Sequence, residues 1–442
     1  MLWRAIALAA LALSAVVLPG SAQSPRRAVV LEISGAIGPA VADYIIGGIA
    51  QAGRESAGLV VLRMDTPGGL AASMRKMVSA ILASPVPVAT FVAPSGARAA
   101  SAGTYIAYAS AVAAMAPGTN IGAATPVQLG GGFLGGEKKK DENQNASEPA
   151  DTETRKLVND SVAYIRSLAE LNKRNADWAE RAVRAAASLT ASAALKENVI
   201  DVIADDVPDL LRKIDGRSAI VAGKPVRLQT SGLQIVEAPP GWRTQLMALV
   251  TDPNIAFLLM LVGIYGIVFE FAAPGTLVPG TIGGICLLLA AYALNLLPIN
   301  YAGVALVVLG IALMIAEVHI GSFGVVGIAG VVSFAIGSFM MFNSGIPGFE
   351  LSFGVIAAAT AATGAFFLLV LGLLLRSHKR PVITGKEALL GAEGESLDWQ
   401  QEEGRVRVLG EVWRARSARP LAPGTRVKVI DREGLVLFVE PA

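Results

Sequence analysis

An almost continuously apolar block from about residue 255 to 375 restricts the fold of this chain more than any other feature. A membrane-spanning helix needs about 20 apolar residues, so the block has room for several. The 442-residue chain is 53% hydrophobic and only 16% charged, with a mean hydropathy of +0.55. Such values lie outside the range of ordinary soluble proteins. They predict a membrane protein that also has soluble parts.

Glycine, proline and polar residues divide the block into five predicted spans. The last span ends at the basic cluster Arg376-Ser377-His378-Lys379-Arg380, which the positive-inside rule places in the cytoplasm. An exported N-terminus then requires an odd number of crossings, and five satisfies this requirement. The predicted spans lie near residues 255–271, 280–297, 301–319, 322–342 and 354–375.

An internal repeat complicates this count. Residues 263–283 resemble residues 310–330 at a constant offset of 47 positions. Either copy is also compatible with a broken or re-entrant segment. The repeat places Glu270 and Glu317 at equivalent positions, and carboxylates are costly in lipid. Two interpretations stay open: a packing or gating hub inside the bundle, or the simpler one, a position near the interface at the end of a span.

The first 22 residues have the pattern of a secretory signal peptide. Arg4 precedes an apolar run from Ala5 to Leu18, and small residues lead to a predicted cleavage site near Ala22. A first transmembrane anchor is the alternative, but the run is short for one. The domain that follows is therefore expected to be exported.

Residues 26–240 alternate between strand and helix patterns. Buried strands are expected at Ala28–Ile33, Leu59–Asp65 and Val86–Val92, with helices between them. This alternation predicts parallel strands in an α/β core. A stretch rich in Gly, Lys, Glu and Asn at 130–150 predicts an exposed loop, and helical periodicity resumes at Asp151.

Residues 381–442 are polar and contain short strands with glycine turns at spacings of about ten residues, which predicts a small five-stranded OB-fold barrel. Such barrels can bind oligonucleotides. Here no array of aromatic residues accompanies the basic ones, and the net charge of the chain is only +2. A protein-contact or structural module is therefore the simpler interpretation, and no nucleic-acid partner is expected.

Residue content limits the chemistry of the exported domain. The two histidines, His319 and His378, both lie downstream of it, and the single cysteine, Cys286, lies in the apolar block. A Ser-His-Asp triad, a cysteine nucleophile, disulfides and a Cys/His zinc site are therefore excluded there. Neither a metal nor a cofactor is expected.

Ser101 is a candidate nucleophile, because Ala100, Ala102 and Gly103 leave room around it for a substrate carbonyl. The alternative is a small residue at a tight helix start. Without histidine, a lysine must take the serine proton. Lys156 opens a long helix on the face opposite an apolar stripe, and that face is either solvent-exposed or the wall of a cleft. Nine lysines precede the apolar block: Lys76, Lys138, Lys139, Lys140, Lys156, Lys173, Lys196, Lys213 and Lys224.

Backbone amides near Ser101 are candidates for stabilising an oxyanion. Gly68 and Gly69 follow a predicted strand and enter a helix, so their N–H groups can approach a substrate closely. The N–H of Ala102, next to the nucleophile, is the natural second donor. Three short segments are thus expected to converge on one site.

The combination of these segments resembles the NfeD family of membrane-bound, ClpP-class serine proteases. The resemblance covers nearly the whole chain, in its long form with a C-terminal OB-fold domain. It is carried by Asp65-Thr66-Pro67-Gly68-Gly69, Ala100-Ser101-Ala102-Gly103-Thr104-Tyr105-Ile106, Met115-Ala116-Pro117-Gly118-Thr119-Asn120-Ile121-Gly122-Ala123, Lys156-Leu157-Val158-Asn159-Asp160 and Ala163-Tyr164-Ile165-Arg166-Ser167-Leu168-Ala169.

The resemblance implies a ClpP/crotonase-like spiral fold for the first domain and a Ser-Lys dyad. Ser101 matches the nucleophile and Lys156 the general base, while Gly69 and Ala102 match the oxyanion donors, with Gly68 beside them. The signal peptide and the basic cluster after the last span predict a protein of the cell membrane with its protease domain on the periplasmic side and its OB domain in the cytoplasm, and a homo-oligomer is expected. The implied substrates are hydrophobic segments of membrane-associated proteins, with a stomatin- or prohibitin-type partner.

Two other function classes are compatible with the sequence. One is a catalytically weak membrane scaffold that organises stomatin- or prohibitin-type assemblies; labelling of Ser101 by a fluorophosphonate discriminates it from a protease. The other is an acyl-thioester enzyme, because the crotonase-like fold also places paired N–H groups around a carbonyl oxygen. No segment resembles a coenzyme A pocket, and export from the cytoplasm argues against one.

Overall fold

A computed structural model describes residues 26–126, 149–272, 274–320, 324–342, 345–378 and 386–442. The predicted signal peptide and residues 130–148 of the predicted loop lie outside this range. The chain divides into two compact units, one of residues 1–316 and 322–361, the other of residues 317–321 and 362–442. Each unit is described by itself.

The first domain is built around a six-stranded sheet in which every pair of neighbours is parallel. Its central strands are continuous apolar runs, because helices cover both faces of a parallel sheet. In spatial order the strands are β11 (Gln234–Glu237), β1 (Arg27–Ser34), β2 (Leu59–Asp65), β3 (Val88–Val92), β5 (Val112–Met115) and β8 (Val202–Ile203).

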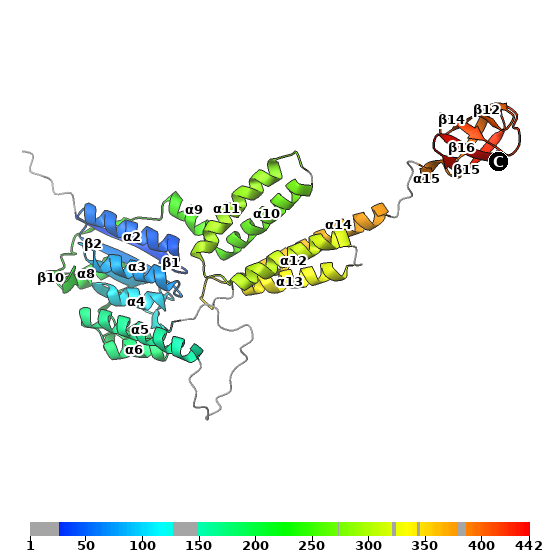
Figure 1. Ribbon diagram of the computed structural model, residues 1–442. Coiled ribbons are helices and arrows are strands. Elements are labelled where there is room, and N and C mark those ends of the chain that lie inside the picture. Colours follow the sequence, from blue (N-terminus) through cyan, green and yellow to red (C-terminus); the bar gives the residue numbers. More distant parts are fainter. Residues whose placement is uncertain (1–25, 127–148, 273, 321–323, 343–344, 379–385) are drawn as a thin grey trace, which may run out of the picture. The chain divides into compact units, whose positions relative to one another are not determined.

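Two buried clusters pack on this sheet. The larger includes side chains of α2 (Pro39–Arg54), α3 (Ala71–Leu82) and α4 (Ala102–Ala109), which lie one after another in Figure 1. Further helices of the same cluster are α5 (Pro149–Leu171), α6 (Ala176–Arg184) and α7 (Ala191–Lys196). The smaller cluster includes α8 (Val207–Ile214), and strands β9 (Ser218–Val221) and β10 (Lys224–Arg227) form a hairpin after it.

A second, three-stranded sheet stands beside the first. In spatial order its strands are β4 (Arg98–Ala100), β6 (Asn120–Gly122) and β7 (Ser188–Thr190). Strands β4 and β6 are parallel, and β6 and β7 are antiparallel. The α/β domain of two sheets, with buried clusters packed on the larger one, confirms the ClpP/crotonase-like fold class that the family resemblance implied.

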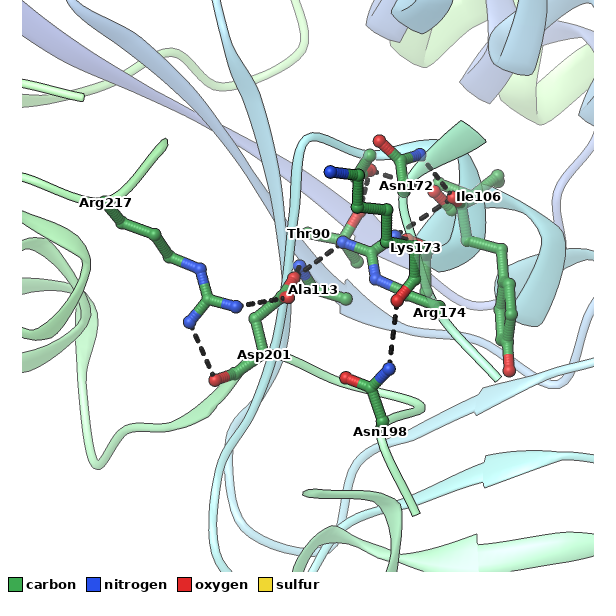
Figure 2. A network of polar contacts seen from close by, with 12 residues as sticks. Thr90, Ile106, Ala113, Asn172, Lys173, Arg174, Asn198, Asp201 and Arg217 are labelled. Carbon is green, nitrogen blue, oxygen red and sulfur yellow. Dashed lines mark hydrogen bonds and ion pairs between the residues drawn. The ribbon is translucent and has the colours of Figure 1, made fainter. Parts of the chain in front are cut away.

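Helix α4 is held at its C-terminal end by a buried arginine. Arg174 donates from Nη1 to the carbonyls of Ala107 (2.9 Å) and Tyr108 (3.0 Å), and from Nη2 to Asp201 (2.6 Å) (Figure 2). The Arg174 side chain is only 2% exposed. The second oxygen of Asp201 accepts from Arg217 at 2.7 Å. A cation at this end satisfies free carbonyls and complements the helix dipole.

This network predicts unequal effects for two arginines that bind the same carboxylate. Replacement of Arg174 by methionine removes the buried cation that pairs with Asp201 and the donor to two helix carbonyls, and should lower the free energy of unfolding by about 3–5 kcal/mol. Arg217→Met removes a 43%-exposed partner and should cost less than about 1 kcal/mol. Unfolding of the detergent-solubilised chain measures both. Equal losses would contradict the assignment of Arg174 as the buried anchor.

The apolar block forms a helical membrane region. Among the residues that the structure describes, four helices are long and apolar enough to cross a membrane, and α13 is a shorter apolar helix of 17 residues. A short helix, α9 (Trp242–Val250), precedes them. The five are α10 (Pro253–Ala272), α11 (Val278–Leu296), α12 (Tyr301–Ile320), α13 (Val325–Met341) and α14 (Phe353–His378). The count of five crossings stays a prediction.

The sequence repeat corresponds to equivalent close contacts in two helical hairpins. In α10–α11, a Cβ at Gly283 would lie 2.9 Å from the carbonyl oxygen of Gly263. In α12–α13, a Cβ at Gly330 would lie 2.7 Å from the carbonyl oxygen of Gly310. Glycine thus allows the backbones to touch at equivalent places.

The two repeated carboxylates have different surroundings. The Glu270 carboxylate lies at the end of α10 and accepts the N–H groups of Leu277 (3.1 Å) and Gly280 (3.3 Å) from the following turn and helix. Glu317, by contrast, is buried. Glu270 therefore fits the interpretation of a carboxylate at a span end, whereas the burial of Glu317 fits an interior position.

The C-terminal domain is a closed five-stranded barrel, as predicted. A short helix, α15 (Lys386–Leu389), leads into it, and valine, leucine and alanine side chains fill its interior. In spatial order its strands are β12 (Glu393–Gln400), β13 (Glu403–Val408), β14 (Glu411–Arg416), β16 (Val436–Pro441) and β15 (Arg426–Glu433).

Candidate functional site

Ser101 occupies a sharp turn between β4 and α4. Its backbone is at φ 51° and ψ −115°, a conformation that side-chain-bearing residues rarely adopt and that often marks functional sites. Its N–H donates to the carbonyl of Gly122 at 2.9 Å, which ties the turn to β6. The apolar residues of α4 are buried behind it. The fold thus presents a single serine at the N-terminus of a buried helix.

The Gly68-Gly69 turn packs directly against Ser101. Gly68 is at φ +117° and Gly69 at φ +156°. A Cβ at Gly68 would lie 2.6 Å from Ser101 Cβ and 3.1 Å from its Oγ. A Cβ at Gly69 would lie 2.3 Å from the carbonyl oxygen of Ile37. Both positions therefore require glycine, for conformation and for space.

Thr66 shapes this turn from inside the protein. Its Oγ1 accepts the N–H of Gly68 at 3.0 Å and donates to the carbonyl of the same residue at 3.1 Å. Its own N–H donates to Arg98 O (2.8 Å), and its carbonyl accepts from Ala100 N–H (3.1 Å). Thr66 is fully buried. One residue therefore connects the glycine turn to the strand that carries Ser101.

Of the three predicted oxyanion donors, two keep an unused N–H. The N–H of Gly68 is occupied by Thr66. Gly69 forms a parallel bridge with Ile37. The two hydrogen bonds of this bridge use the carbonyl of Gly68 as acceptor and the N–H of Leu70 as donor, so they leave the N–H of Gly69 unused. Within the part of the chain that the structure describes, neither the N–H of Gly69 nor that of Ala102 donates a hydrogen bond. Ala102 is the first residue of α4, where N–H groups lack helical partners.

Gly69, Ser101 and Ala102 line one cavity of about 350 Å³, and Gly68 does not line it. The protease-domain side of the cavity also includes the apolar side chains of Leu70, Met74, Tyr105 and Tyr164. The structure thus brings Ser101 together with two unused N–H groups, in a recess of mainly apolar lining.

Two tyrosines and an arginine form one side of this recess. The rings of Tyr105 and Tyr164 stack at 6.0 Å, and the Arg75 guanidinium lies 4.5 Å from the centre of the Tyr164 ring. Arg75 also pairs with Asp160 at 2.5 Å. Burial raises the pKa of Tyr105 to about 12, so this phenol is neutral at physiological pH.

Lys156 does not line the cavity. It lies in the first turns of α5, where its side chain is exposed, while Ser161 and Tyr164 of the same helix do line the cavity. From Thr152 to Leu157 no side chain is buried. The structure therefore places Lys156 on the helix that borders the recess, but on an exposed face of it.

The sequence did not predict Thr66, Tyr105 and Tyr164 as parts of the site, although all three lie within the segments that carry the family resemblance. Thr66 had one signal: a hydroxyl directly after a buried strand and before Pro67. Among the described residues, no group of three or more His, Cys, Asp or Glu side chains is placed to hold a metal ion.

Three family profiles match the chain in order. They are the NfeD1b N-terminal domain at residues 28–223, the NfeD integral membrane domain at 254–373 and the NfeD-like C-terminal, partner-binding domain at 386–441. The chain is also 35% identical, over 420 residues, to the membrane-bound protease PH1510 of Pyrococcus horikoshii, covering 93% of this chain and 92% of that protein. The chain belongs to the NfeD family.

Two further similarities accompany this one. The membrane protein NfeD1b of Bacillus subtilis is 25% identical over 408 residues, covering 90% of this chain and 84% of that protein. A solved structure, a lysine-to-alanine mutant of the 1510-N membrane-bound stomatin-specific protease in complex with a substrate peptide, is 36% identical. It covers 52% of this chain and 99% of that chain, with a TM-score of 0.44. The family resemblance and the membrane location inferred from the sequence are confirmed.

Thr66 supplies a matched test of the site geometry. Thr66→Val keeps the side-chain volume but removes both hydrogen bonds to Gly68, so the glycine turn loses its anchor against Ser101. Covalent labelling of Ser101 by a fluorophosphonate should slow by about tenfold or more. Thr66→Ser keeps the hydroxyl and should label at close to the parent rate. Labelling of the valine variant at the parent rate would contradict a positioning role for the Thr66 hydroxyl.

Proposed function

We propose that this protein is a membrane-anchored serine endopeptidase with Ser101 as nucleophile and Lys156 as general base. The observation that carries the proposal is Ser101 on its sharp, positive-φ turn, in one recess with Gly69 and Ala102, whose N–H groups donate no hydrogen bond among the described residues. The 35% identity to a membrane-bound protease over nearly the whole chain supports it.

The reaction follows from these positions. Lys156 Nζ takes the proton of Ser101 Oγ as the oxygen attacks the substrate carbonyl carbon. The N–H groups of Gly69 and Ala102 donate to the oxyanion that forms. The C–N bond then breaks, the lysine protonates the leaving amine, and an acyl ester remains on Ser101. Water, deprotonated by the same lysine, attacks this ester and releases the acid.

Lys156 must enter the recess to act as this base. The first turns of α5 hold no buried side chain between Thr152 and Leu157, so a shift of these turns breaks little packing. We therefore propose that Lys156 reaches Ser101 when a substrate occupies the cavity.

The proposed substrates are hydrophobic segments of membrane-associated proteins. Apolar side chains dominate the lining of the cavity, and burial of apolar substrate surface there favours binding. The 1510-N relative is described as stomatin-specific, and the C-terminal profile is described as partner-binding. By these similarities we propose a stomatin- or prohibitin-type membrane protein as substrate and partner, and a homo-oligomeric enzyme.

A catalytically weak scaffold for stomatin- or prohibitin-type assemblies is the second candidate. The similarity to NfeD1b, which is described only as a membrane protein, and the exposed position of Lys156 favour it. A scaffold would bind its partner through the same domains but would leave peptides intact.

Substitution of the dyad separates the two candidates. In the full chain, Ser101→Ala and Lys156→Ala should each lower cleavage of an apolar peptide by about 10³-fold or more, because each removes one half of a unit that acts together. Lys76→Ala, an exposed lysine of α3 outside the cavity lining, is the control and should cleave at the parent rate. Undiminished cleavage by either dyad variant would refute the proposed mechanism.

We propose that the protease domain lies on the periplasmic side of the cell membrane and the barrel in the cytoplasm. Single cysteines in place of Lys224 and Arg419, both exposed, test this in a Cys286→Ala background. In intact spheroplasts, a membrane-impermeant maleimide should label the cysteine at 224 and should label the one at 419 only after lysis. The opposite pattern would reverse the proposed orientation.

A further inference from the structure

The cavity at Ser101 has a second wall, formed by two connections of the membrane region. Leu297 and Pro298 follow α11, and Ile346 and Pro347 lie between α13 and α14; all four line the cavity, as does the last residue of α11. None of these residues is charged. Both connections belong to the same compact unit as the protease domain.

The connection between α13 and α14 packs closely on the protease domain. Phe349 is only 4% exposed, and a Cβ at Gly38 would lie 3.2 Å from its Cζ. A Cβ at Gly348 would lie 2.5 Å from the Cβ of Ala36. A side chain at Gly348 would therefore clash with Ala36, and one at Gly38 would require the Phe349 ring to shift.

The contacted residues, Ala36 and Gly38, flank Ile37, which is hydrogen-bonded to both neighbours of the proposed oxyanion donor Gly69. Ile37, between the two contacted positions 36 and 38, donates its N–H to Gly68 O (2.8 Å) and accepts the N–H of Leu70 (2.9 Å). These bonds flank Gly69. The membrane region is therefore in contact with the backbone that orients the Gly69 N–H.

The five predicted crossings place both connections on the side of the protease domain. The protease domain precedes α10, so with one crossing per helix the chain returns to its side after α11 and again after α13. The two connections that line the cavity are these two. A pocket built from them lies at the surface of the bilayer.

We propose that Leu297, Pro298, Ile346 and Pro347 form the membrane-side wall of the substrate pocket and select peptide segments with a large apolar side chain beside the scissile bond, where the segment leaves the bilayer. This inference rests on the proposed function. The wall provides apolar surface for a leucine-sized side chain and no charged group for a polar one. Burial of the apolar side chain against it therefore favours binding. Its prolines limit backbone rotation and keep the wall in shape.

Peptide binding to the full chain in lipid nanodiscs tests the wall without catalysis. A Ser101→Ala background prevents cleavage, and two fluorescent peptides differ only by leucine or alanine at the residue preceding the scissile bond. The parent background should bind the leucine peptide more tightly. In Leu297→Ala and Ile346→Ala, this preference should fall by about tenfold, since each removes part of an apolar pocket.

Leu288→Ala is the matched control. Leu288 is 74% exposed on α11, the helix that directly precedes Leu297. It makes the same chemical change and should keep the parent preference. Thermal unfolding confirms that each variant is folded. An unchanged preference for leucine in both folded wall variants would overturn the proposal.

The proposed function and the wall fail in different measurements. Absence of peptide cleavage by the chain with Ser101 intact would refute the endopeptidase, yet the binding preference would still report on the wall. Conversely, normal cleavage with an unchanged binding preference in the wall variants would leave the endopeptidase in place and refute the wall.

Discussion

The site depends on the buried hydrogen bonds of Thr66. Its backbone pairs with Arg98 and Ala100, directly before Ser101, and its hydroxyl holds both polar groups of Gly68. Thr66 thereby joins the Gly68-Gly69 turn to the strand before Ser101 by hydrogen bonds. Because a buried N–H without a partner costs about 1–3 kcal/mol, the glycine turn has little freedom to leave this position. Ser101 and the proposed oxyanion donors are thus positioned together.

Much of the architecture follows from patterns in the sequence. The apolar block, the alternation of strands and helices, and the short strands after residue 381 predict three kinds of domain, and the structure has all three. Hydrophobic periodicity suffices to predict these domain types, because each of the three patterns can bury its apolar residues in only one kind of architecture. The repeat of 47 positions also has a structural counterpart, since glycine pairs touch at equivalent places in two hairpins.

The site was only partly predictable. Ser101, Gly69 and Ala102 converge as the motifs indicated, because a parallel bridge between Thr66 and Ala99 joins the segments that carry them. Gly68 differs, since its N–H is used by a side chain that local sequence does not reveal as a partner. For Lys156, the helix pattern leaves the polar face as either solvent-exposed or a cleft wall. That choice depends on what packs against α5, which is a tertiary property.

The proposed oxyanion donors are peptide N–H groups, and this has a consequence for how the protein responds to acidity. Peptide amides at Gly69 and Ala102 do not titrate at any pH a cell experiences, whereas side-chain donors can lose or gain protons. Stabilisation of the oxyanion would therefore stay constant as the acidity of the surroundings changes. Adaptation of the activity to a more acidic or more alkaline surrounding would have to come from changes elsewhere in the site.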